Sequence, residues 1–351
     1  MSEYRLNTSK IPGASFGAIL NVGGNPDCEA AVAFLESNAA QVQDLLLEAD
    51  GLLVMPGWTQ IPANPQWLVR LSRVFGPEVE NYHDTLTPPN MIHTDVEEIL
   101  VLSEAPPCSK QPPPQPDPPR TESGDLPITF PHRRGWHTDQ SFRRPPPDIS
   151  LFYAVTPAPI DQAQTLFANG YAAYEALSDE QKHRIDNMVG LHALLGTGRS
   201  ESAVRAGETP QPLLPHQRSQ RQPVVRRHPV TGRKALYLCE AGQMDWVDGP
   251  FVDMEPGIEG DGAKLLYELM THYTQPEFVY AHPWHAGDLL IYDNRSMVHA
   301  ATWYDAERHH REMWRTTVHG NPGPEYAAES KSWLPKDDSK PIDGLTNYKW
   351  R

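Results

Sequence analysis

The stretch Gly287-Asp-Leu-Leu-Ile-Tyr-Asp-Asn-Arg-Ser-Met-Val-His-Ala300 decides the fold prediction. A turn at Gly287 opens a run of apolar residues, and the pair Asp293-Asn294, typical of turns, ends it. His299 then follows on the returning segment. The pattern predicts a short buried strand, a turn and a second segment that brings a histidine back beside the first.

Similar short apolar runs recur along the chain. Strands are expected over residues 51–56, 98–103, 149–155, 165–168, 224–227, 235–239, 278–281, 288–292 and 313–318. Helical spacing of apolar residues is found over 25–50, 64–75, 178–189 and 262–273, the third opening on the capping-box pattern of Ser178 and Gln181. Many short strands with a few packed helices predict a mainly β chain with flanking helices and a double-stranded β-helix (jelly-roll) core.

The 351 residues are expected to form a single domain over 1–351, with ample apolar material for a core. Proline accounts for 36 of them, about twice the usual share, which favours short strands and loops over a helical bundle. The segment 105–125 is so rich in proline that it is predicted to be an exposed polyproline-like insertion within the domain. The polar segment 196–222 is a candidate for a mobile lid.

The formal net charge of −15 disfavours a nucleic-acid partner, because phosphate backbones are bound by clustered lysine and arginine. The N-terminus has no apolar signal region, and no run of 18 apolar residues occurs, so no membrane partner is expected. Three scattered cysteines form neither a disulfide framework nor a zinc pattern. These features predict a cytoplasmic protein.

Two His-x-Asp triplets, His93-Thr-Asp95 and His137-Thr-Asp139, are candidates for a metal site. About one such triplet is expected by chance with 15 histidines, so context has to separate them. Two histidines and one carboxylate on one face of a metal are the ligand set of non-haem Fe(II) oxygenases, and residues i and i+2 of an extended segment project to the same side. His93 runs into further carboxylates and is interpreted as a surface or loop histidine.

The other triplet has a partner downstream, because His299 lies on the returning segment described above. Arg311 and Arg315 follow 12 and 16 residues later, before a predicted strand, where a guanidinium can grip a carboxylate with two parallel hydrogen bonds. Zinc also accepts two histidines and an aspartate, so a zinc hydrolase remains an alternative, as does a non-catalytic jelly-roll binding protein.

Several motifs in this order resemble the family of taurine dioxygenase and the phenoxyacetate-herbicide dioxygenases. They cover roughly residues 130–320, and more faintly 10–103. The motifs are Trp136-His-Thr-Asp139, Gln164-Thr-Leu-Phe167, Gly170-Tyr-Ala-Ala-Tyr-Glu-Ala-Leu-Ser178, Arg227-His-Pro-Val-Thr-Gly-Arg233, Pro276-Glu-Phe-Val-Tyr280 and the stretch from Gly287 to Arg315.

The resemblance implies a double-stranded β-helix in which decarboxylation of 2-oxoglutarate, with O2, is coupled to oxidation of a small organic substrate. It implies Fe(II) ligands at His137, Asp139 and His299 and a 2-oxoglutarate site at Thr165 and Arg311. Arg315 matches a position near the second carboxylate or an anionic substrate group, so an anionic substrate is expected. Helix-mediated homo-oligomers are compatible with the family. His83, in Asn81-Tyr-His83, falls near a segment that reaches the substrate pocket.

The chain also departs from the family pattern. Gln162-Ala-Gln precedes Thr165 where Gly-Asp is common, and the spacing from His299 to Arg311 is one residue longer than usual, which makes Arg308 a rival clamp. The neighbouring pair His309-His310 is expected to be exposed. The proline-rich insertion is not typical of the family, and it is expected to cover or shape the substrate entrance.

Overall fold

The stretch Gly287–Ala300 forms two strands that lie in different sheets. The computed structural model describes residues 4–23, 27–85, 87–116, 122, 135–240 and 242–333. In it, β13 (Leu289–Asp293) belongs to a large sheet, whereas the returning segment, β14 (Met297–Ala301), belongs to a smaller one. The turn at 294–296 therefore carries the chain from one sheet to the other, which is how a double-stranded β-helix is built.

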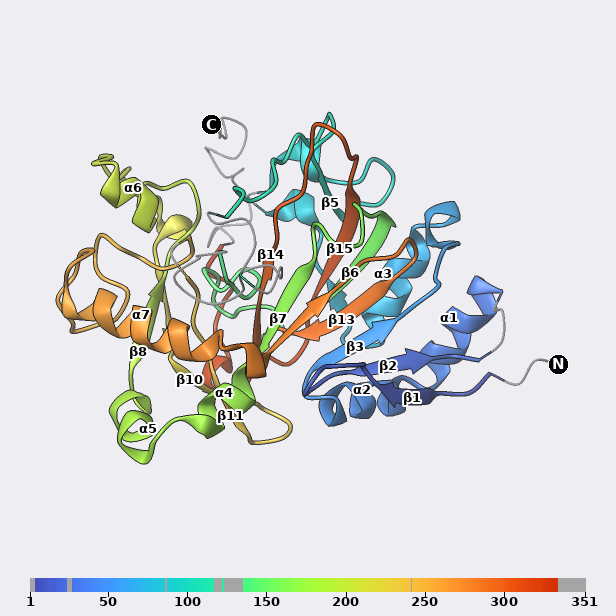
Figure 1. The fold of residues 1–351 in the computed structure, drawn as a ribbon, viewed down its shortest axis with the longest axis horizontal. Coiled ribbons are helices and arrows are strands. Elements are labelled where there is room, and N and C mark those ends of the chain that lie inside the picture. Colours follow the sequence, from blue (N-terminus) through green and yellow to red (C-terminus); the bar gives the residue numbers. More distant parts are fainter. Residues whose placement is uncertain are drawn as a thin grey trace.

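The large sheet has eight strands and runs through the middle of the molecule (Figure 1). All its pairings are antiparallel except the parallel one between β2 and β3. Its order is β1 (Asn7–Lys10), β2 (Ala18–Asn21), β3 (Leu52–Met55), β13, β6 (Ile149–Thr156), β15 (Glu312–His319) and β4 (Glu78–Val79), and β5 (Leu100–Ser103) also pairs with β15.

The smaller sheet has the order β12 (Val279–His282), β7 (Thr165–Asn169) and β14. Two further pairs, β8 (Val189–His192) with β9 (Gln220–Pro223) and β10 (Val225–Arg227) with β11 (Lys234–Leu236), extend the molecule beyond it. The helices are α1 (Cys28–Ser37), α2 (Ala39–Glu48), α3 (Gln66–Arg73), α4 (Gly170–Ala176), α5 (Asp179–Ile185), α6 (Glu201–Arg205) and α7 (Asp261–Tyr273).

Three apolar clusters fill the spaces between the layers of helices and sheets. They form on both faces of each sheet because strand side chains alternate between the two faces. On β13, Leu289 and Ile291 pack toward α1, α2 and α3, whereas Leu290 and Tyr292 face the smaller sheet. The third cluster joins the outer face of the smaller sheet to α4 and α7, which lie beside it in Figure 1. The layers are thus helices, large sheet, small sheet and helices, and the jelly-roll prediction is confirmed.

Several local predictions differ from the structure in their boundaries. The helix expected over 25–50 is two helices broken at Asn38, whose φ of −117° and ψ of 26° are neither helical nor extended. Residues 24–26 lie outside the described part. The strand expected over 235–239 ends at Leu236. The polar and fully exposed β1 and the helix α4 have no apolar periodicity that would predict them.

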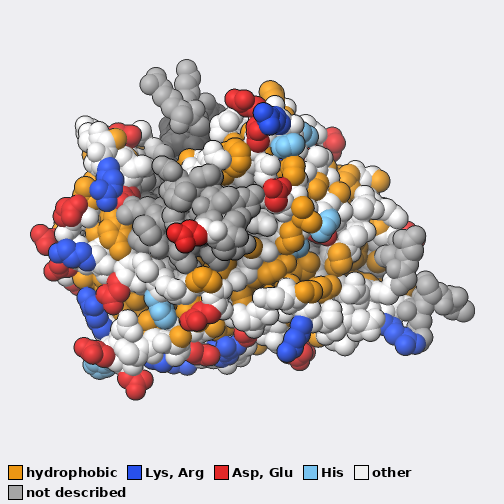
Figure 2. Space-filling view, in the orientation of Figure 1, with side chains coloured by type: hydrophobic (Ala, Val, Ile, Leu, Met, Phe, Trp, Pro, Cys, Tyr) orange, Lys and Arg blue, Asp and Glu red, His pale blue; other side chains and the backbone are white. Residues whose placement is uncertain are grey.

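Part of the predicted proline-rich insertion, residues 117–121 and 123–125, lies outside the described residues. The segment 196–222 holds α6 and β9, and Arg199 within it forms a buried ion pair with Asp245. No helix among the described residues is long and apolar enough to cross a membrane. On the face drawn in Figure 2, charged side chains lie mainly toward the rim and hydrophobic ones gather across the middle.

Candidate metal centre

His137 and His299 are held opposite each other by backbone hydrogen bonds. The His137 N–H donates to the His299 carbonyl at 2.9 Å, and the His299 N–H donates to the His137 carbonyl at 2.7 Å. Such a reciprocal pair makes two antiparallel residues direct neighbours, and the ring centroids lie 4.3 Å apart. The segment before β6 of the large sheet is thereby joined to β14 of the smaller one.

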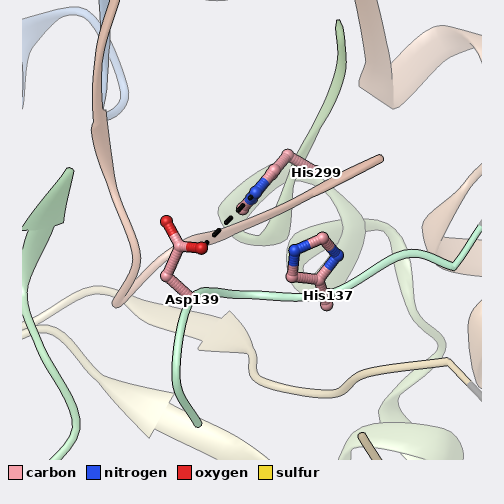
Figure 3. Close-up of side chains that lie close together, drawn as sticks. All are labelled: His137, Asp139 and His299. Carbon is pink, nitrogen blue, oxygen red and sulfur yellow. Dashed lines mark ion pairs between the residues drawn. The ribbon is translucent and has the colours of Figure 1, made fainter. Parts of the chain in front are cut away.

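Asp139 projects toward the same point from two residues further along (Figure 3). Its backbone N–H donates to Asn294 Oδ1 at 3.2 Å, which fixes the segment against the turn between β13 and β14. The Ser150 and Tyr292 hydroxyls donate to Asp139 Oδ2 at 2.7 and 2.8 Å. Those bonds leave Oδ1 on the side of His299, whose Nε2 lies 3.8 Å from it.

One donor atom from each of the three residues lies within 4.8 Å of the other two. The His137 Nδ1 is 2.8 Å from the Gly135 carbonyl, which can only accept a hydrogen bond, so Nδ1 carries the proton and Nε2 keeps its lone pair. Neutral imidazole nitrogens and a carboxylate are suitable donors for a divalent transition metal such as Fe(II). The donor set therefore fits the expected metal.

The electrostatic environment keeps the three donors in the forms that bind a metal. Burial lowers the pKa of His299 to about 3, and the neighbouring His137 adds to the effect. The pKa of His137 is also lowered by burial. Although burial alone would raise the pKa of Asp139, the Arg315 guanidinium and the two imidazoles hold it well below its ordinary value. Both imidazoles are thus neutral and the carboxylate is ionised at neutral pH.

A cavity of about 330 Å³ adjoins these side chains and is lined by both sheets. In the ladder between β14 and β7, His299 pairs with Phe167 and Ala301 pairs with Thr165, so alternate residues of both strands face the same side. The Thr165 hydroxyl, which lines the cavity, accepts a hydrogen bond from the Trp284 indole N–H at 3.0 Å. Its own proton remains available to a ligand.

Arg311 enters the cavity at the start of β15 and is only 8% exposed. Its guanidinium lies 5.9 Å from the ring centres of both Phe152 and Tyr304. Within the described part of the chain it forms no ion pair, and its Nε has no hydrogen-bond partner. Burial consequently lowers the pKa of Arg311 to about 10. An uncompensated buried cation of this kind is a candidate binding group for an anion.

Arg315 also lines the cavity, and its Nη1 forms an ion pair with Asp139 Oδ1, whereas its Nε has no hydrogen-bond partner among the described residues. Although burial alone would lower the pKa of Arg315, the Asp139 carboxylate raises it, and the nearby phenols of Tyr82 and Tyr292 add to the effect. Arg315 therefore holds the carboxylate in place, a contact that the sequence interpretation did not foresee.

The remaining sequence candidates are not among the residues that line the cavity. His83, in the 3₁₀ turn Tyr82–Asp84, is exposed, and its role toward the substrate stays a prediction. Arg308, the rival clamp, has an 80% exposed side chain that pairs with Asp305. His93 packs edge-on against Trp314, as a structural histidine, and His310 is 47% exposed, as expected.

Sequence reasoning missed two residues of the site that belong to the proline-rich insertion and its approach. Lys110 lines the cavity directly. Glu104 lies just outside it and accepts hydrogen bonds from the Arg311 backbone N–H at 3.0 Å and the Tyr304 hydroxyl at 2.9 Å. The sequence signal for Glu104 was a charged residue directly after the apolar strand expected over 98–103. Nothing in the neighbouring sequence indicates that this strand lies beside β15.

Comparison with known proteins gives similarities along most of the chain. The model of the family described as taurine catabolism dioxygenase TauD, TfdA family, matches residues 8–317. Pentalenolactone F synthase from Streptomyces arenae is 34% identical over 183 residues, covering 50% of this chain and 58% of that protein. The alpha-ketoglutarate-dependent 2,4-dichlorophenoxyacetate dioxygenase of Burkholderia sp. (strain RASC) is 31% identical over 185 residues, covering 53% and 58%. The chain thus spans less than two thirds of the length of these relatives.

Solved structures share the fold. A taurine dioxygenase from Burkholderia xenovorans superposes with a TM-score of 0.60 at 24% identity, covering 90% of each chain. The structure of AAD-2 in complex with Mn(II) and N-oxalylglycine superposes with a TM-score of 0.61 at 24% identity, covering 90% of this chain and 98% of that one.

Proposed function

Because the chain belongs to the TauD/TfdA family of dioxygenases, we propose that it is an Fe(II)- and 2-oxoglutarate-dependent dioxygenase that oxidises a small anionic organic molecule. One observation carries the proposal: three candidate metal ligands, one on β14 and two on the segment beside it, converge within 4.8 Å next to a cavity. That cavity also holds a buried guanidinium that forms no ion pair with the described residues. The Burkholderia relative is named as alpha-ketoglutarate-dependent, and 2-oxoglutarate, as a dicarboxylate, would suit a cavity that has both a metal centre and a buried guanidinium.

His137, Asp139 and His299 are the residues that would hold the Fe(II). When bound, Fe(II) supplies the redox chemistry by which 2-oxoglutarate and O2 yield succinate and CO2 while the substrate is oxidised. The protein's own contribution is to orient these donors. The Gly135 carbonyl fixes the tautomer of His137, and the Ser150 and Tyr292 hydroxyls fix the rotation of the Asp139 carboxylate.

Arg311 and Thr165 are the groups proposed to bind the distal carboxylate of 2-oxoglutarate. A guanidinium can donate two parallel hydrogen bonds to a carboxylate, and the threonine hydroxyl can donate a third. The Trp284 indole occupies one lone pair of the Thr165 oxygen, which orients its proton. An ionised carboxylate would also compensate the buried charge of Arg311, which forms no ion pair with the described residues.

The aromatic side chains around the cavity exclude water from this region. Phe152, Tyr292 and Tyr304 line it, and the Phe152 ring packs edge-on against Trp284 with centroids 5.2 Å apart. Exclusion of bulk water strengthens the interaction of Arg311 with an anion, because the effective dielectric constant falls. It also shields reactive species from side reactions.

The two His-x-Asp triplets provide a matched test of the metal centre. We expect His137→Ala to weaken Fe(II) binding by more than about 100-fold, since loss of even an outer hydrogen-bond partner of a ligand costs roughly 10- to 100-fold. His93→Ala, in the triplet that packs against Trp314, should leave the affinity unchanged. Binding is measured anaerobically by calorimetry, and the visible absorption that appears with 2-oxoglutarate reports the ternary complex.

Succinate and CO2 release from 2-oxoglutarate under air is the functional readout. Wild-type protein and His93→Ala should produce both, and His137→Ala neither. A wild-type protein that binds Zn(II) but turns over no 2-oxoglutarate with Fe(II), ascorbate and a broad panel of organic acids would refute the proposal.

A further inference from the structure

A buried ion pair lies against the turn that follows the candidate ligand Asp139. Glu80, directly after β4, and Arg143 have side chains that are only 4% and 5% exposed, and Arg143 Nη1 forms an ion pair with Glu80 Oε1. Neither residue is among those that line the cavity. We propose that Glu80 is a positioning residue for the metal centre, which acts through Gln140 to hold the turn after Asp139 in the conformation that metal binding requires. This assignment deepens the proposed function and rests on its metal centre.

Gln140 has a backbone conformation that is unusual for a residue with a side chain. Its φ is +51°, in the left-handed region where the Cβ atom crowds the following carbonyl oxygen. The Gln140 carbonyl accepts a hydrogen bond from the Arg143 N–H at 2.9 Å, so the chain turns directly after the ligand. Such a conformation persists only where the surrounding contacts impose it. The contacts of the buried Gln140 side chain therefore determine how the chain leaves Asp139.

The amide of Gln140 is held at both ends by the ion pair. Its Nε2 donates to Glu80 Oε2, and its Oε1 accepts from Arg143 Nη1 at 3.0 Å. Glu80 thus gives one carboxylate oxygen to Gln140 and the other to Arg143. A change of the Gln140 φ to a negative value would carry the amide away from both partners and leave buried polar groups unsatisfied, which is costly. The three side chains therefore form a clamp on the turn.

The clamp is anchored to the large sheet. The Glu80 N–H donates to the Thr317 carbonyl of β15 at 2.9 Å, and the Nε2 atom of His319, on the same strand, lies 3.6 Å from Glu80 Oε1. Although burial alone would raise the pKa of Glu80, Arg143 and His319 lower it to about 2, so the carboxylate is ionised at neutral pH. An ionised acceptor makes a stronger hydrogen bond than a neutral one.

The ring of Trp333 covers the clamp on one side. The Arg143 guanidinium lies 5.0 Å from the centre of this ring, and the His319 and Trp333 ring centroids are 5.5 Å apart. An apolar cover of this kind keeps water from competing for the buried hydrogen bonds, which strengthens them. The clamp is thus built to hold one arrangement of the turn.

The ligand segment is consequently held on both sides of Asp139. Before it, His137 exchanges two backbone hydrogen bonds with His299, and after it the clamp fixes Gln140. Between these two points the Asp139 side chain places its Oδ1 3.8 Å from His299 Nε2. Metal ligands bind most tightly when the surrounding structure already holds them in the required geometry. Loss of the clamp should therefore weaken metal binding although all three donor side chains remain.

The test titrates metal-free protein with Co(II), followed by calorimetry and visible absorption. Co(II) takes the same nitrogen and oxygen donors as Fe(II), and its absorption bands report their geometry. Glu80→Gln removes the charge of the carboxylate and keeps its shape. Gln140→Ala removes the amide and leaves the ion pair between Glu80 and Arg143 intact, and a third variant combines both changes. Arg199→Met is the matched control, because Arg199 and Asp245 form an ion pair with side chains 9% and 0% exposed outside the metal centre.

We expect Glu80→Gln and Gln140→Ala each to lower the Co(II) affinity roughly 10-fold, the lower end of the range for outer partners of metal ligands, and to shift the absorption bands. The double variant should lose no more than the larger single loss, since both changes break the same contact. Arg199→Met should keep the affinity and the spectrum of the wild type, although its urea midpoint falls. A role of Glu80 in stability alone would leave the spectrum of the folded protein unchanged.

The assignment of Glu80 is overturned if Glu80→Gln or Gln140→Ala keeps the wild-type affinity and spectrum, or if their losses add in the double variant. It is also overturned if Arg199→Met loses as much affinity as Glu80→Gln, or if wild-type protein binds no Co(II). Should Glu80→Gln fail to fold, Gln140→Ala decides alone, because its ion pair is intact. Absence of 2-oxoglutarate turnover with Fe(II) is a separate result, which removes the proposed function and leaves the Co(II) comparison standing.

Discussion

Replacing Arg311 with leucine should stabilise the ligand-free protein while it abolishes tight binding of 2-oxoglutarate. The guanidinium is 8% exposed and has no ion-pair partner within the described part of the chain. In the folded protein its charge is therefore poorly solvated, whereas in the unfolded chain it is fully hydrated. The matched variant is Arg295→Leu, because Arg295 is equally buried but forms an ion pair with Asp293 at 2.6 Å.

The magnitude follows from the environment of each guanidinium. Burial lowers the pKa of Arg311 from 12.5 to about 10, which corresponds to about 3 kcal/mol against the charged form at neutral pH. The contacts with Phe152 and Tyr304 offset roughly 1–2 kcal/mol of that cost, so Arg311→Leu should raise the free energy of unfolding by about 1–2 kcal/mol. Arg295→Leu leaves the Asp293 carboxylate buried without its arginine counter-ion and should lower the free energy of unfolding by about 3–5 kcal/mol.

Urea denaturation of metal-free protein in the absence of 2-oxoglutarate measures both changes, and calorimetric titration measures the co-substrate. Loss of a charge-assisted pair should weaken 2-oxoglutarate binding to Arg311→Leu by about 3 kcal/mol, or roughly 100-fold. If Arg311→Leu is destabilised as strongly as Arg295→Leu, the guanidinium has a structural partner and the reasoning fails. It fails equally if Arg311→Leu binds 2-oxoglutarate with the wild-type affinity.

Three further outcomes are expected. Glu104→Ala removes the carboxylate that accepts a hydrogen bond from the Arg311 backbone N–H. This change should raise the Kd of 2-oxoglutarate roughly 10-fold. A Kd equal to that of the wild type, measured by calorimetric titration, would contradict the prediction. Gly170→Ala should lower the free energy of unfolding, measured by urea denaturation, by about 3 kcal/mol. The new Cβ would lie 2.6 and 2.9 Å from the Ser296 and Leu236 carbonyl oxygens. An unchanged urea midpoint would show that the backbone moves to make room, and would contradict this prediction. Because desolvation lowers the pKa of Lys110, on the cavity wall, to about 8, the affinity for an organic acid should be full below that pH and should fall as the pH rises through it. A pH-independent affinity in wild-type protein, or the same fall in Lys110→Met, would exclude Lys110 as the titrating group.

The contact between the segments of His137 and His299 could be predicted from the sequence, because it depends on short-range patterns. His137 and Asp139 are two residues apart on an extended segment, so they project together, and the apolar run before Asp293 marks a buried strand. The turn at 294–296 then fixes how far His299 can lie from that strand. These signals are short-range in nature, and the jelly-roll prediction rests on them.

The role of Arg315 and the position of Lys110 depend instead on pairings between distant strands. Arg315 reaches Asp139 only because β15 pairs with β6 in the register that sets Arg315 opposite Phe152. Lys110 reaches the cavity only because β5 pairs with the other edge of β15. Strand register is set by the complete hydrophobic pattern of a sheet, so a single segment does not reveal it. Low-complexity composition also concealed the structured start of the insertion, where Cys108 is buried.

The charge distribution explains why the cavity needs its own cations. The protein carries a net charge of −15, and its proposed co-substrate and substrate are both anions, so the mean field of the molecule repels them. Salt screens exposed charges beyond about 8 Å at physiological ionic strength, which leaves the groups inside the cavity to determine binding. Among the described residues, Lys110, Arg311 and Arg315 line the cavity and Asp139 lies beside it, so cationic side chains outnumber carboxylates there, and the metal would add two further positive charges.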